Sequence, residues 1–397
     1  MKIYNYPSAA AEKKVSALVN RDLDFKQKDY QVVSRIIDDV RRNGDNAVIK
    51  YANRFDAPKL APGSIKVTAR EMDAAVKKVD RRFVRALNRA ASQIEAFHRQ
   101  QVQQSWIDTQ RSGTLLGQLV NPVDAAGVYV PGARGGKTPL ISTVLMTGIP
   151  AKIAGVKNRV MVSPSTRAGG VNPHLLVAAK KVGIKDIYKV GSAWAIAALA
   201  YGPETIPRVD VIAGPGNIYV TLAKKIVSGT VGIDMIAGPS EVLVIADHTA
   251  TPEYAAADLL AQAEHDVLSS AILVTDSDRM ARAVAAETDK QLAALTRKEI
   301  AGESLKRFGA GFVVEDLDAA VELANRIAPE HLELQISEPF EYIGQIRNAG
   351  AVFLGHYTPE PVGDYVAGPN HVLPTAGTAR FSSALSVDHF LKKTSVI

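Results

Sequence analysis

Apolar residues recur at three- and four-residue spacing along the first quarter of the chain, and charged residues fill the positions between them. This periodicity is typical of amphipathic helices that bury one face against a core. It predicts helices over residues 9–19, 30–55 and 69–102. Two prolines and a glycine within residues 56–63 predict a break between the last two. We therefore expect a helical N-terminal region that reaches about residue 107.

From about Gly113 the pattern changes to short β-branched runs, most of them followed by an alanine-rich helical pattern. Such alternation is typical of parallel sheets with crossover helices. The expected strands fall into two groups, 127–130, 159–162, 186–190 and 209–212, then 241–246, 271–274, 312–314 and 351–354. Residues 209–216 are echoed by residues 233–240, which supports a boundary near Ser240. The fold class that we predict is α/β with two parallel sheets.

The composition is that of a globular protein of two to three domains, with 397 residues, 47% of them hydrophobic and 22% charged. The absence of cysteine excludes disulfides, thiolate nucleophiles, and cysteine-based zinc or iron–sulfur sites. No run of 18 apolar residues occurs, and the N-terminus lacks the apolar run of a signal peptide. We therefore expect a soluble cytoplasmic protein without a membrane partner.

The formal net charge of +6 arises from 47 basic and 41 acidic residues spread along the chain. The basic residues are not interleaved with aromatic ones, which make up only 6% of the chain. This distribution argues against a nucleic-acid partner and favours attraction of anionic metabolites or cofactors.

Two polar motifs are candidate binding sites. One is a turn that follows an expected strand of the first group, and the other lies on the helix expected at residues 255–265. The turn at residues 214–217 offers backbone N–H groups to a phosphate, or is simply a helix start capped by Asn217. Gln262 and His265, three residues apart near a helix end, would share one face. Two interpretations are open: the two residues bind a divalent metal together, or they are ordinary surface or core side chains.

Two further motifs lie near the C-terminus. Glu330 and His331 come directly after a proline at the start of a strand, where they would form an acid/base pair or be common strand-end charges. A polar segment at residues 363–371 contains Asp364 and His371, and a solvated loop is an equally simple interpretation of it. Each motif by itself is weak evidence for a site.

Taken together and in order, the motifs resemble those of the histidinol dehydrogenase family over nearly the whole chain. The matching stretches are residues 128–132, 149–156, 213–217, 219–220, 232–247, 261–265, 328–334, 363–365, 370–371, 373–375 and 381–383. The resemblance implies an NAD-linked, zinc-dependent oxidation of L-histidinol to L-histidine through the aldehyde, in histidine biosynthesis. It also implies a homodimer.

The resemblance assigns roles to particular residues. It implies that zinc is held by Gln262, His265 and Asp364, and that Glu330 and His331 are the catalytic acid/base pair. The residues implied to contact the substrate are Ser240, Gln262, His265, His331 and Asp364. Those implied to contact NAD are Tyr129 and Asn217. It further implies two Rossmann-like, aldehyde-dehydrogenase-like domains without a glycine fingerprint. We expect an N-terminal arm at 1–27, a discontinuous first domain at 28–128 plus 241–385, a second domain at 129–240, and a C-terminal remnant at 386–397.

Three features depart from the family pattern. Trp194 stands where the family usually has glutamine facing NAD, so it either lines the coenzyme site or fills space. The loop after Pro131 carries two cations, Arg134 and Lys137, which leaves open another small polyol or amino alcohol as substrate. Relatives continue beyond the position of Ile397 with a tail whose histidine completes the zinc shell in the partner subunit. Its absence here leaves open a metal-binding or assembly protein without turnover.

Oxidation of an alcohol to an acid needs water to add to the intermediate aldehyde. Because this chain has no cysteine to hold the aldehyde, a general base must drive the hydration. We expect His331 to be that base, with a pKa near 6.5, or above it if Glu330 stabilises the cation. Adjacent residues of an extended segment point to opposite sides, so both reach one substrate only if the chain turns after Pro329.

Overall fold

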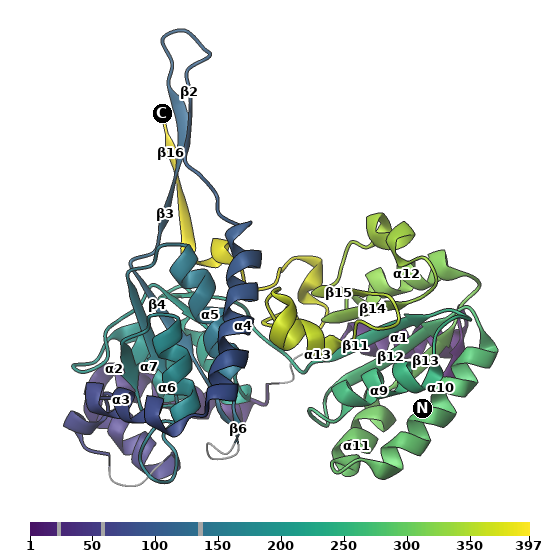
Figure 1. Ribbon diagram of the computed structural model, residues 1–397, viewed down its shortest axis with the longest axis horizontal. Helices are drawn as coiled ribbons and strands as arrows, with labels where there is room; N and C mark the ends of the chain where they lie inside the picture. Colours follow the sequence, from purple (N-terminus) through teal and green to yellow (C-terminus); the bar gives the residue numbers. More distant parts are fainter. Residues whose placement is uncertain (22–24, 57–59, 134–137) are drawn as a thin grey trace. The chain divides into compact units, whose positions relative to one another are not determined.

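The computed structural model describes residues 1–21, 25–56, 60–133 and 138–397 (Figure 1). The chain forms two compact units, each built from several segments. Unit 1 comprises Met1–Asp24, Ala237–Gly363 and Leu373–Ala384. Unit 2 comprises Phe25–Ile236, Asp364–Val372 and Leu385–Ile397. Every helix in the described parts of the chain is too short or too polar to traverse a bilayer.

Unit 2 is built on a parallel sheet with the strand order β10-β9-β4-β7-β8. The strands are β4 (Ala125–Tyr129), β7 (Asn158–Val162), β8 (Asp186–Tyr188), β9 (Val211–Ala213) and β10 (Gly232–Ile233). The chain runs from β4 outward to β8 and then returns to β9 on the other side of β4. This reversal creates a switch point between β4 and β9, the place where open α/β sheets bind ligands at the carboxyl ends of their strands.

Helices cover both faces of this sheet, and each face has its own hydrophobic core. They are α2 (Gln27–Phe55), α3 (Ala69–Lys78), α4 (Arg81–Arg99), α5 (Ile141–Ile153), α6 (Pro173–Lys181), α7 (Ser192–Tyr201) and α8 (Ile218–Val227). Val128 packs with α4, α5 and α6, whereas the next residue, Tyr129, packs with α2, α7 and α8. This alternation follows from the two-residue period of a strand. The short strands β5 (Gly132–Ala133) and β6 (Thr138–Pro139) pair with each other.

The predicted helix over residues 69–102 is two helices, α3 and α4. Val79 is extended, and the Asp80 carboxylate accepts the Phe83 N–H at 2.6 Å as the cap of α4. An aspartate that caps a helix start satisfies a backbone donor that the helix itself leaves unpaired. The periodicity runs through this boundary because both helices bury their apolar sides against the same core, which the hydrophobic pattern alone does not reveal.

Unit 1 contains a second parallel sheet, in the order β1-β13-β12-β11-β14-β15. Its strands are β1 (Ile3–Asn5), β11 (Glu241–Ala246), β12 (Ser270–Thr275), β13 (Ala310–Val313), β14 (His331–Gln335) and β15 (Ala351–Leu354). Its helices are α1 (Ala9–Val19), α9 (Pro252–Ala263), α10 (Asp278–Ala294), α11 (Lys298–Phe308), α12 (Leu317–Ile327) and α13 (Glu360–Val362). One face packs on α1 and α12, the other on α9, α10 and α11. The α/β fold with two parallel sheets is thus confirmed.

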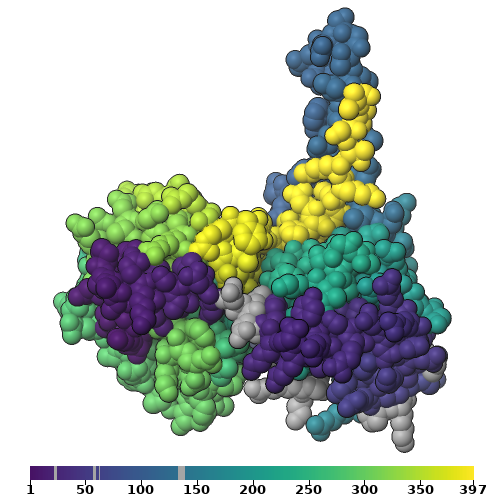
Figure 2. All heavy atoms as spheres, turned by 180° about the vertical axis from the view of Figure 1, so that it is seen from behind, coloured from purple at the N-terminus to yellow at the C-terminus, as the bar shows by residue number. Residues whose placement is uncertain are grey.

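A three-stranded antiparallel sheet forms an arm on unit 2, with β3 (Leu116–Pro122) between β2 (Trp106–Asp108) and β16 (Leu391–Val396). Figure 1 shows the arm projecting beyond the helices of its unit, and Figure 2 shows from behind the C-terminal strand lying along it. The hydrophobic pattern did not predict this sheet, because nearly all positions of its strands are at least partly exposed and the apolar residues Leu116, Leu119 and Val120 do not recur at a two-residue spacing.

The two units differ from the predicted domains. Residues 28–128 were expected in one domain with 241–385, but the contacts place them in unit 2. The reason is packing, because α2 lies against α7 and α8, and β4 pairs with both β7 and β9. The predicted N-terminal arm instead adds β1 to the edge of the unit 1 sheet, and the predicted C-terminal remnant supplies β16 to the arm.

Candidate active site

Three buried polar side chains of unit 1 gather where β11 and β14 begin. Glu241 is the first residue of β11, and His331 is the first residue of β14, which pairs with it. The Nδ1 atom of His331 lies 2.9 Å from the carbonyl oxygen of Glu241, and Oε2 of Glu330 accepts the N–H of Glu241 at 3.0 Å. One peptide segment therefore fixes both members of the predicted acid/base pair.

The chain turns just before this pair, as the prediction required, but one position earlier than expected. Ala328 adopts a left-handed conformation with φ 55° at the end of α12. This conformation ends the helix and redirects the backbone. Oε2 of Glu330 consequently lies 3.9 Å from Nδ1 of His331, although the residues are adjacent in sequence.

The carboxyl group of Glu330 sits in a strongly desolvated place. Burial raises the pKa of Glu330 well above its usual value, and the neighbouring carboxylates of Glu241 and Glu360 raise it further. The hydrogen bonds that Glu330 accepts from Glu241 and Ser240 lower this pKa but do not cancel the increase. Burial also raises the pKa of Glu241, although Arg21 pairs with that carboxylate at 2.8 Å. Burial and the neighbouring carboxylates thus favour the protonated form of Glu330 more than water does.

His331 is held as a neutral base. Because a carbonyl oxygen only accepts hydrogen bonds, Nδ1 carries the ring proton and Nε2 has the lone pair. Burial lowers the pKa of His331 below its usual value, while the charges of Glu360 and Glu241 oppose the shift. The expected pKa near 6.5 or above is therefore wrong, because desolvation outweighs the neighbouring carboxylates. Nε2 is buried and has no hydrogen-bond partner in the described part of the chain.

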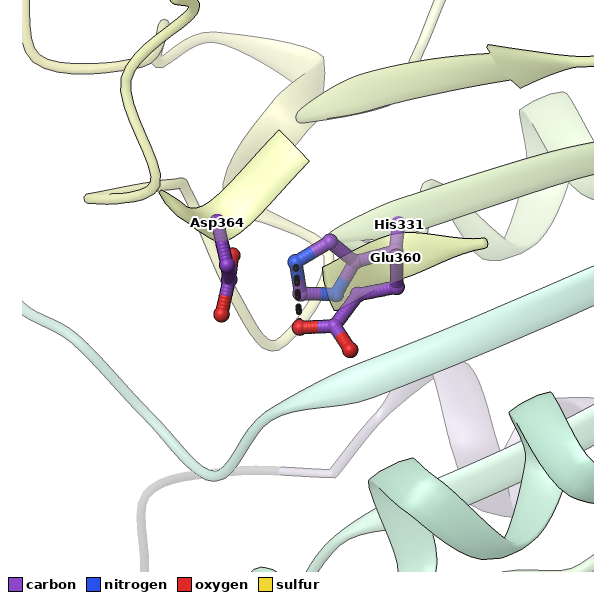
Figure 3. A group of neighbouring side chains, drawn as sticks. All are labelled: His331, Glu360 and Asp364. Atoms are coloured by element: carbon purple, nitrogen blue, oxygen red, sulfur yellow. Dashed lines mark ion pairs between the residues drawn. The ribbon is translucent and has the colours of Figure 1, made fainter. Parts of the chain in front are cut away.

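The free Nε2 faces two carboxylates. It lies 4.0 Å from Oε1 of Glu360, and Asp364 follows in the chain four residues after that glutamate. Ligand atoms of His331, Glu360 and Asp364 lie within 4.8 Å of one another, which makes them a group able to hold a metal ion (Figure 3). Glu360 was not among the predicted site residues. Its spacing of four from Asp364 was an available signal, because this spacing brings side chains together on a helical turn.

Gln262 and His265 meet at the end of α9. Nε2 of Gln262 lies 3.1 Å from Nδ1 of His265, and the chain turns there so that His265 N–H bonds to the Gln262 carbonyl at 3.2 Å. Gln262 is 1% exposed, and its Oε1 has no hydrogen-bond partner within the described ranges. A buried, unpaired amide oxygen beside an imidazole is a donor set that suits a divalent metal.

These groups share one edge of the unit 1 sheet. Ser240 precedes β11, and His331 is the first residue of β14. Gln262 lies in the last turn of α9, and His265 lies on the connection from α9 to β12. All three strands are parallel, so their starts lie at the same, amino-terminal edge. The structure therefore brings the predicted residues of unit 1 to one edge, opposite to the carboxyl ends where such sheets usually bind ligands.

The predicted coenzyme residues lie in unit 2, two of them at its switch point. Tyr129 ends β4, and Asn217 caps α8, accepting the N–H groups of Tyr219 and Val220 at 3.1 and 3.2 Å. Gly214, which follows β9, has φ 129°, and a Cβ there would lie 2.1 Å from the carbonyl oxygen of Tyr129. Only glycine permits this close approach of the two strand ends at the switch point.

A buried ion pair stabilises the turn between β9 and α8. Lys224 of α8 pairs with Asp234, and both side chains are almost fully buried. The ammonium group donates to the Gly214 carbonyl at 3.0 Å, and Asp234 accepts the Gly214 N–H at 2.8 Å. The two charges thus fix both backbone groups of the glycine on which the turn depends.

Trp194 is 4% exposed and belongs to the core between the sheet and α2. Its ring stacks on Tyr51 and Phe55, at centroid distances of 6.0 and 5.6 Å. Its role in coenzyme binding stays a prediction. The predicted cationic loop residues Arg134 and Lys137 lie outside the described residues.

Comparison with known proteins gives a consistent match. The family model for histidinol dehydrogenase matches residues 20–397. The histidinol dehydrogenase of Desulfotalea psychrophila is 54% identical over 98% of this chain and 90% of the relative, and that of Heliobacterium mobile is 50% identical over 100% and 91%. The crystal structure of histidinol dehydrogenase from Elizabethkingia anophelis superposes with a TM-score of 0.93 at 40% identity, covering 100% of this chain and 90% of that one. A propionaldehyde dehydrogenase structure from Rhodopseudomonas palustris, at 13% identity and a TM-score of 0.51, shares the fold.

Proposed function

The chain belongs to the histidinol dehydrogenase family, and we propose on this premise that it oxidises L-histidinol to L-histidine through histidinal, in histidine biosynthesis. The observation that carries the mechanism is the buried His331, whose Nδ1 is tied to the Glu241 carbonyl and whose Nε2 is left as a base. Steady-state formation of NADH from histidinol and from histidinal tests the proposal.

We propose that Gln262, His265 and Asp364 hold zinc, and that unit 2 holds NAD at Tyr129 and Asn217. The unpaired amide oxygen of Gln262 supports the first assignment, and the position of Tyr129 and Gly214 at the switch point between β4 and β9 supports the second. When bound, zinc anchors and polarises the substrate, and NAD accepts the hydride in each oxidation.

His331 supplies the base for both oxidations. In the first, Nε2 takes the hydroxyl proton of the alcohol as the C–H bond loses its hydride. In the second, it takes a proton from the water that adds to the aldehyde, or from the hydrate that results. The hydrogen bond to the Glu241 carbonyl holds the ring in the required tautomer and orientation, and Ser240 lies beside Glu330 at the same edge.

Glu330→Gln is expected to slow aldehyde oxidation more than alcohol oxidation. Glutamine keeps a side-chain oxygen that can accept the hydrogen bond from the Glu241 N–H, but it cannot gain or lose a proton, so it cannot help to activate water. The rates of NADH formation from histidinal and from histidinol measure the difference, with Glu322→Gln, an exposed glutamate of the same unit, as control. Equal losses on both substrates would refute the division of labour.

The two other interpretations of the sequence make distinct predictions in the same assay. Another small polyol or amino alcohol as substrate was motivated by Arg134 and Lys137, which lie outside the described residues, whereas the family match favours histidinol. A metal-binding or assembly protein would bind zinc and form no NADH from any substrate. The retained, buried acid/base pair favours an enzyme over that alternative.

We propose further that the protein is a homodimer whose interface includes the arm. Its exposed large apolar residues are Trp106, Ile107, Leu115, Leu116 and Leu119, each at least 40% exposed. Apolar side chains gathered on a projecting sheet are typical of an interface, and a second copy offers the same surface. A cytoplasmic location and the absence of a nucleic-acid partner remain part of this proposal, on the composition and the scattered basic residues.

Trp106→Ala is expected to weaken the dimer by about tenfold or more, because a two-fold interface loses the buried ring twice. Sedimentation velocity over a concentration series measures the dissociation constant. Ser112→Ala, at an exposed polar position of the same arm, is the control. A dimer of unchanged affinity in Trp106→Ala would place the interface elsewhere.

A further inference from the structure

A carboxyl group that the proposed mechanism does not use lies at the end of α2 in unit 2. Asp56 is the residue at which this helix ends, and its own N–H bonds to the Ala52 carbonyl. Its Oδ2 atom is buried and has no hydrogen-bond partner in the part of the chain that the structure describes. A buried carboxylate oxygen without a partner is costly, so it calls for an explanation.

Two donors face this carboxyl group without fully satisfying it. Burial raises the pKa of Asp56 to about 7, and the Gly191 N–H and the Trp194 indole oppose that shift because they favour the anion. The Gly191 N–H belongs to the start of α7, where the helix dipole favours a nearby carboxylate, but no side-chain hydrogen bond caps this helix in the described structure. Oδ2 of Asp56 and Nε1 of Trp194 are both buried without a hydrogen-bond partner within the described residues.

This pair lies next to the residues that we propose for the coenzyme. Phe55, the residue before Asp56, stacks on the Trp194 ring at a centroid distance of 5.6 Å. Trp194 follows Ser192 by two residues, which places the pair beside the Tyr129 hydroxyl. The same hydroxyl accepts the Ser192 N–H at 3.0 Å. Ser192 has φ 52°, an uncommon conformation for a residue other than glycine, and such backbone strain clusters at ligand sites.

The carboxyl ends of β4, β7 and β8 converge there. Gly132 and Gly191 both approach Pro164 so closely that a Cβ at either glycine would lie within 2.7 Å of the proline ring. The hydroxyl oxygens of Ser163 and Ser165, on either side of this proline, are also buried without hydrogen-bond partners in the described segments. Unpaired polar atoms thus cluster at the edge of the sheet where dinucleotides bind in Rossmann-like folds.

We propose that Asp56 and Trp194 bind the hydroxyl groups of the adenosine ribose of NAD, and that this contact selects NAD over NADP. A ribose hydroxyl donates to Oδ2 of Asp56 while a hydroxyl oxygen accepts from Nε1 of Trp194, so one diol satisfies both orphaned atoms. A carboxylate in this position repels the 2′-phosphate of NADP, as acidic residues do in other dinucleotide sites. Trp194 then contacts the coenzyme through its indole N–H, while its ring remains packed in the core. The inference rests on the proposed NAD site of unit 2.

Binding of reduced coenzymes to the full chain, followed by nicotinamide emission, tests this inference without reference to turnover. We expect wild type to bind NADH about tenfold or more tightly than 2′-deoxy-NADH, the loss expected for a hydrogen bond to a charged group, and to discriminate further against NADPH. Asp56→Asn should weaken NADH binding and abolish most of both preferences. Trp194→Phe keeps the ring but removes the N–H, and should cost about threefold to tenfold.

The outcomes separate this inference from the function on which it rests. Asp73→Asn, an exposed carboxylate of the same unit, is the matched control and should bind like wild type. Wild type that binds no NADH would refute the proposed coenzyme site itself. Wild type that binds NADH and 2′-deoxy-NADH equally would leave the coenzyme site standing and overturn the role of Asp56. That second result needs no variant, so it decides the matter even if Asp56→Asn fails to fold.

Discussion

His331→Asn is expected to slow the oxidation of both histidinol and histidinal by about a hundredfold or more, the usual scale for loss of a general base. The asparagine side-chain amide can still donate to the Glu241 carbonyl, so the local structure should persist. It has no basic nitrogen to replace Nε2, which is buried and unpaired in the described structure. Both half-reactions should therefore suffer together.

Steady-state kinetics on each substrate separately measure this effect. His248→Asn, at an exposed histidine of the same unit, is the control and should retain wild-type rates. Undiminished activity of His331→Asn on both substrates would remove His331 from the site, and a loss on one substrate only would assign it to that step alone.

His265→Ala is expected to abolish stoichiometric zinc binding and, with it, most of the activity. The imidazole contacts the Gln262 amide at 3.1 Å, and removing it would leave the buried amide oxygen without its neighbouring ligand. The fold should survive, because His265 lies beyond the end of α9 and outside the hydrophobic cores of unit 1. Loss of one of few protein ligands commonly costs orders of magnitude in metal affinity.

Metal analysis after dialysis, together with a thermal unfolding curve, tests this expectation. His248→Ala controls for removal of an imidazole elsewhere in the unit. Undiminished zinc in His265→Ala would refute the ligand set drawn from Gln262, His265 and Asp364. It would favour instead the group of His331, Glu360 and Asp364, whose ligand atoms lie within 4.8 Å of one another.

The dependence of kcat/KM on pH follows from the burial of His331. Because burial lowers the pKa of His331 below 6.5, the neutral form, which acts as the base, predominates at pH 6.5 and above. Activity should rise with pH as His331 loses its proton, with the midpoint of this limb below 6.5, and should be lost progressively as the pH falls through it. A midpoint well above 6.5 that disappears in His331→Asn would mean that neighbouring carboxylates stabilise the cation after all.

Much of the fold was predictable because its elements follow simple periodicities. After its first residue, Glu241, the strand β11 is a continuous apolar run to Ala246, as expected of a strand covered on both faces. The division into units was not predictable in the same way, since the pairing of β4 with β9 and the packing of α2 on α7 join segments far apart in sequence. The arm was missed because nearly all positions of its strands are at least partly exposed and the apolar residues of β3 do not recur at a two-residue spacing.

The site residues divide in the same way, into those that local sequence motifs indicate and those that depend on contacts between distant segments. Glu330 with His331 and Gln262 with His265 are near neighbours in sequence, so local motifs indicated both pairs. The contact of His331 with the Glu241 main chain spans 90 positions, and that of the Gly214 turn with Asp234 depends on strand order. Glu360 and the lowered pKa of His331 depend on burial, which only the folded structure reveals.

The central claim is that this chain carries out both oxidations of histidinol to histidine. The most direct measurement is the amount of NADH formed when limiting L-histidinol is consumed to completion with excess NAD, together with identification of the product. Two equivalents of NADH per histidinol, with histidine as the product and no free histidinal, are the predicted result. One equivalent with accumulated histidinal, or no NADH from a zinc-loaded protein, would contradict it.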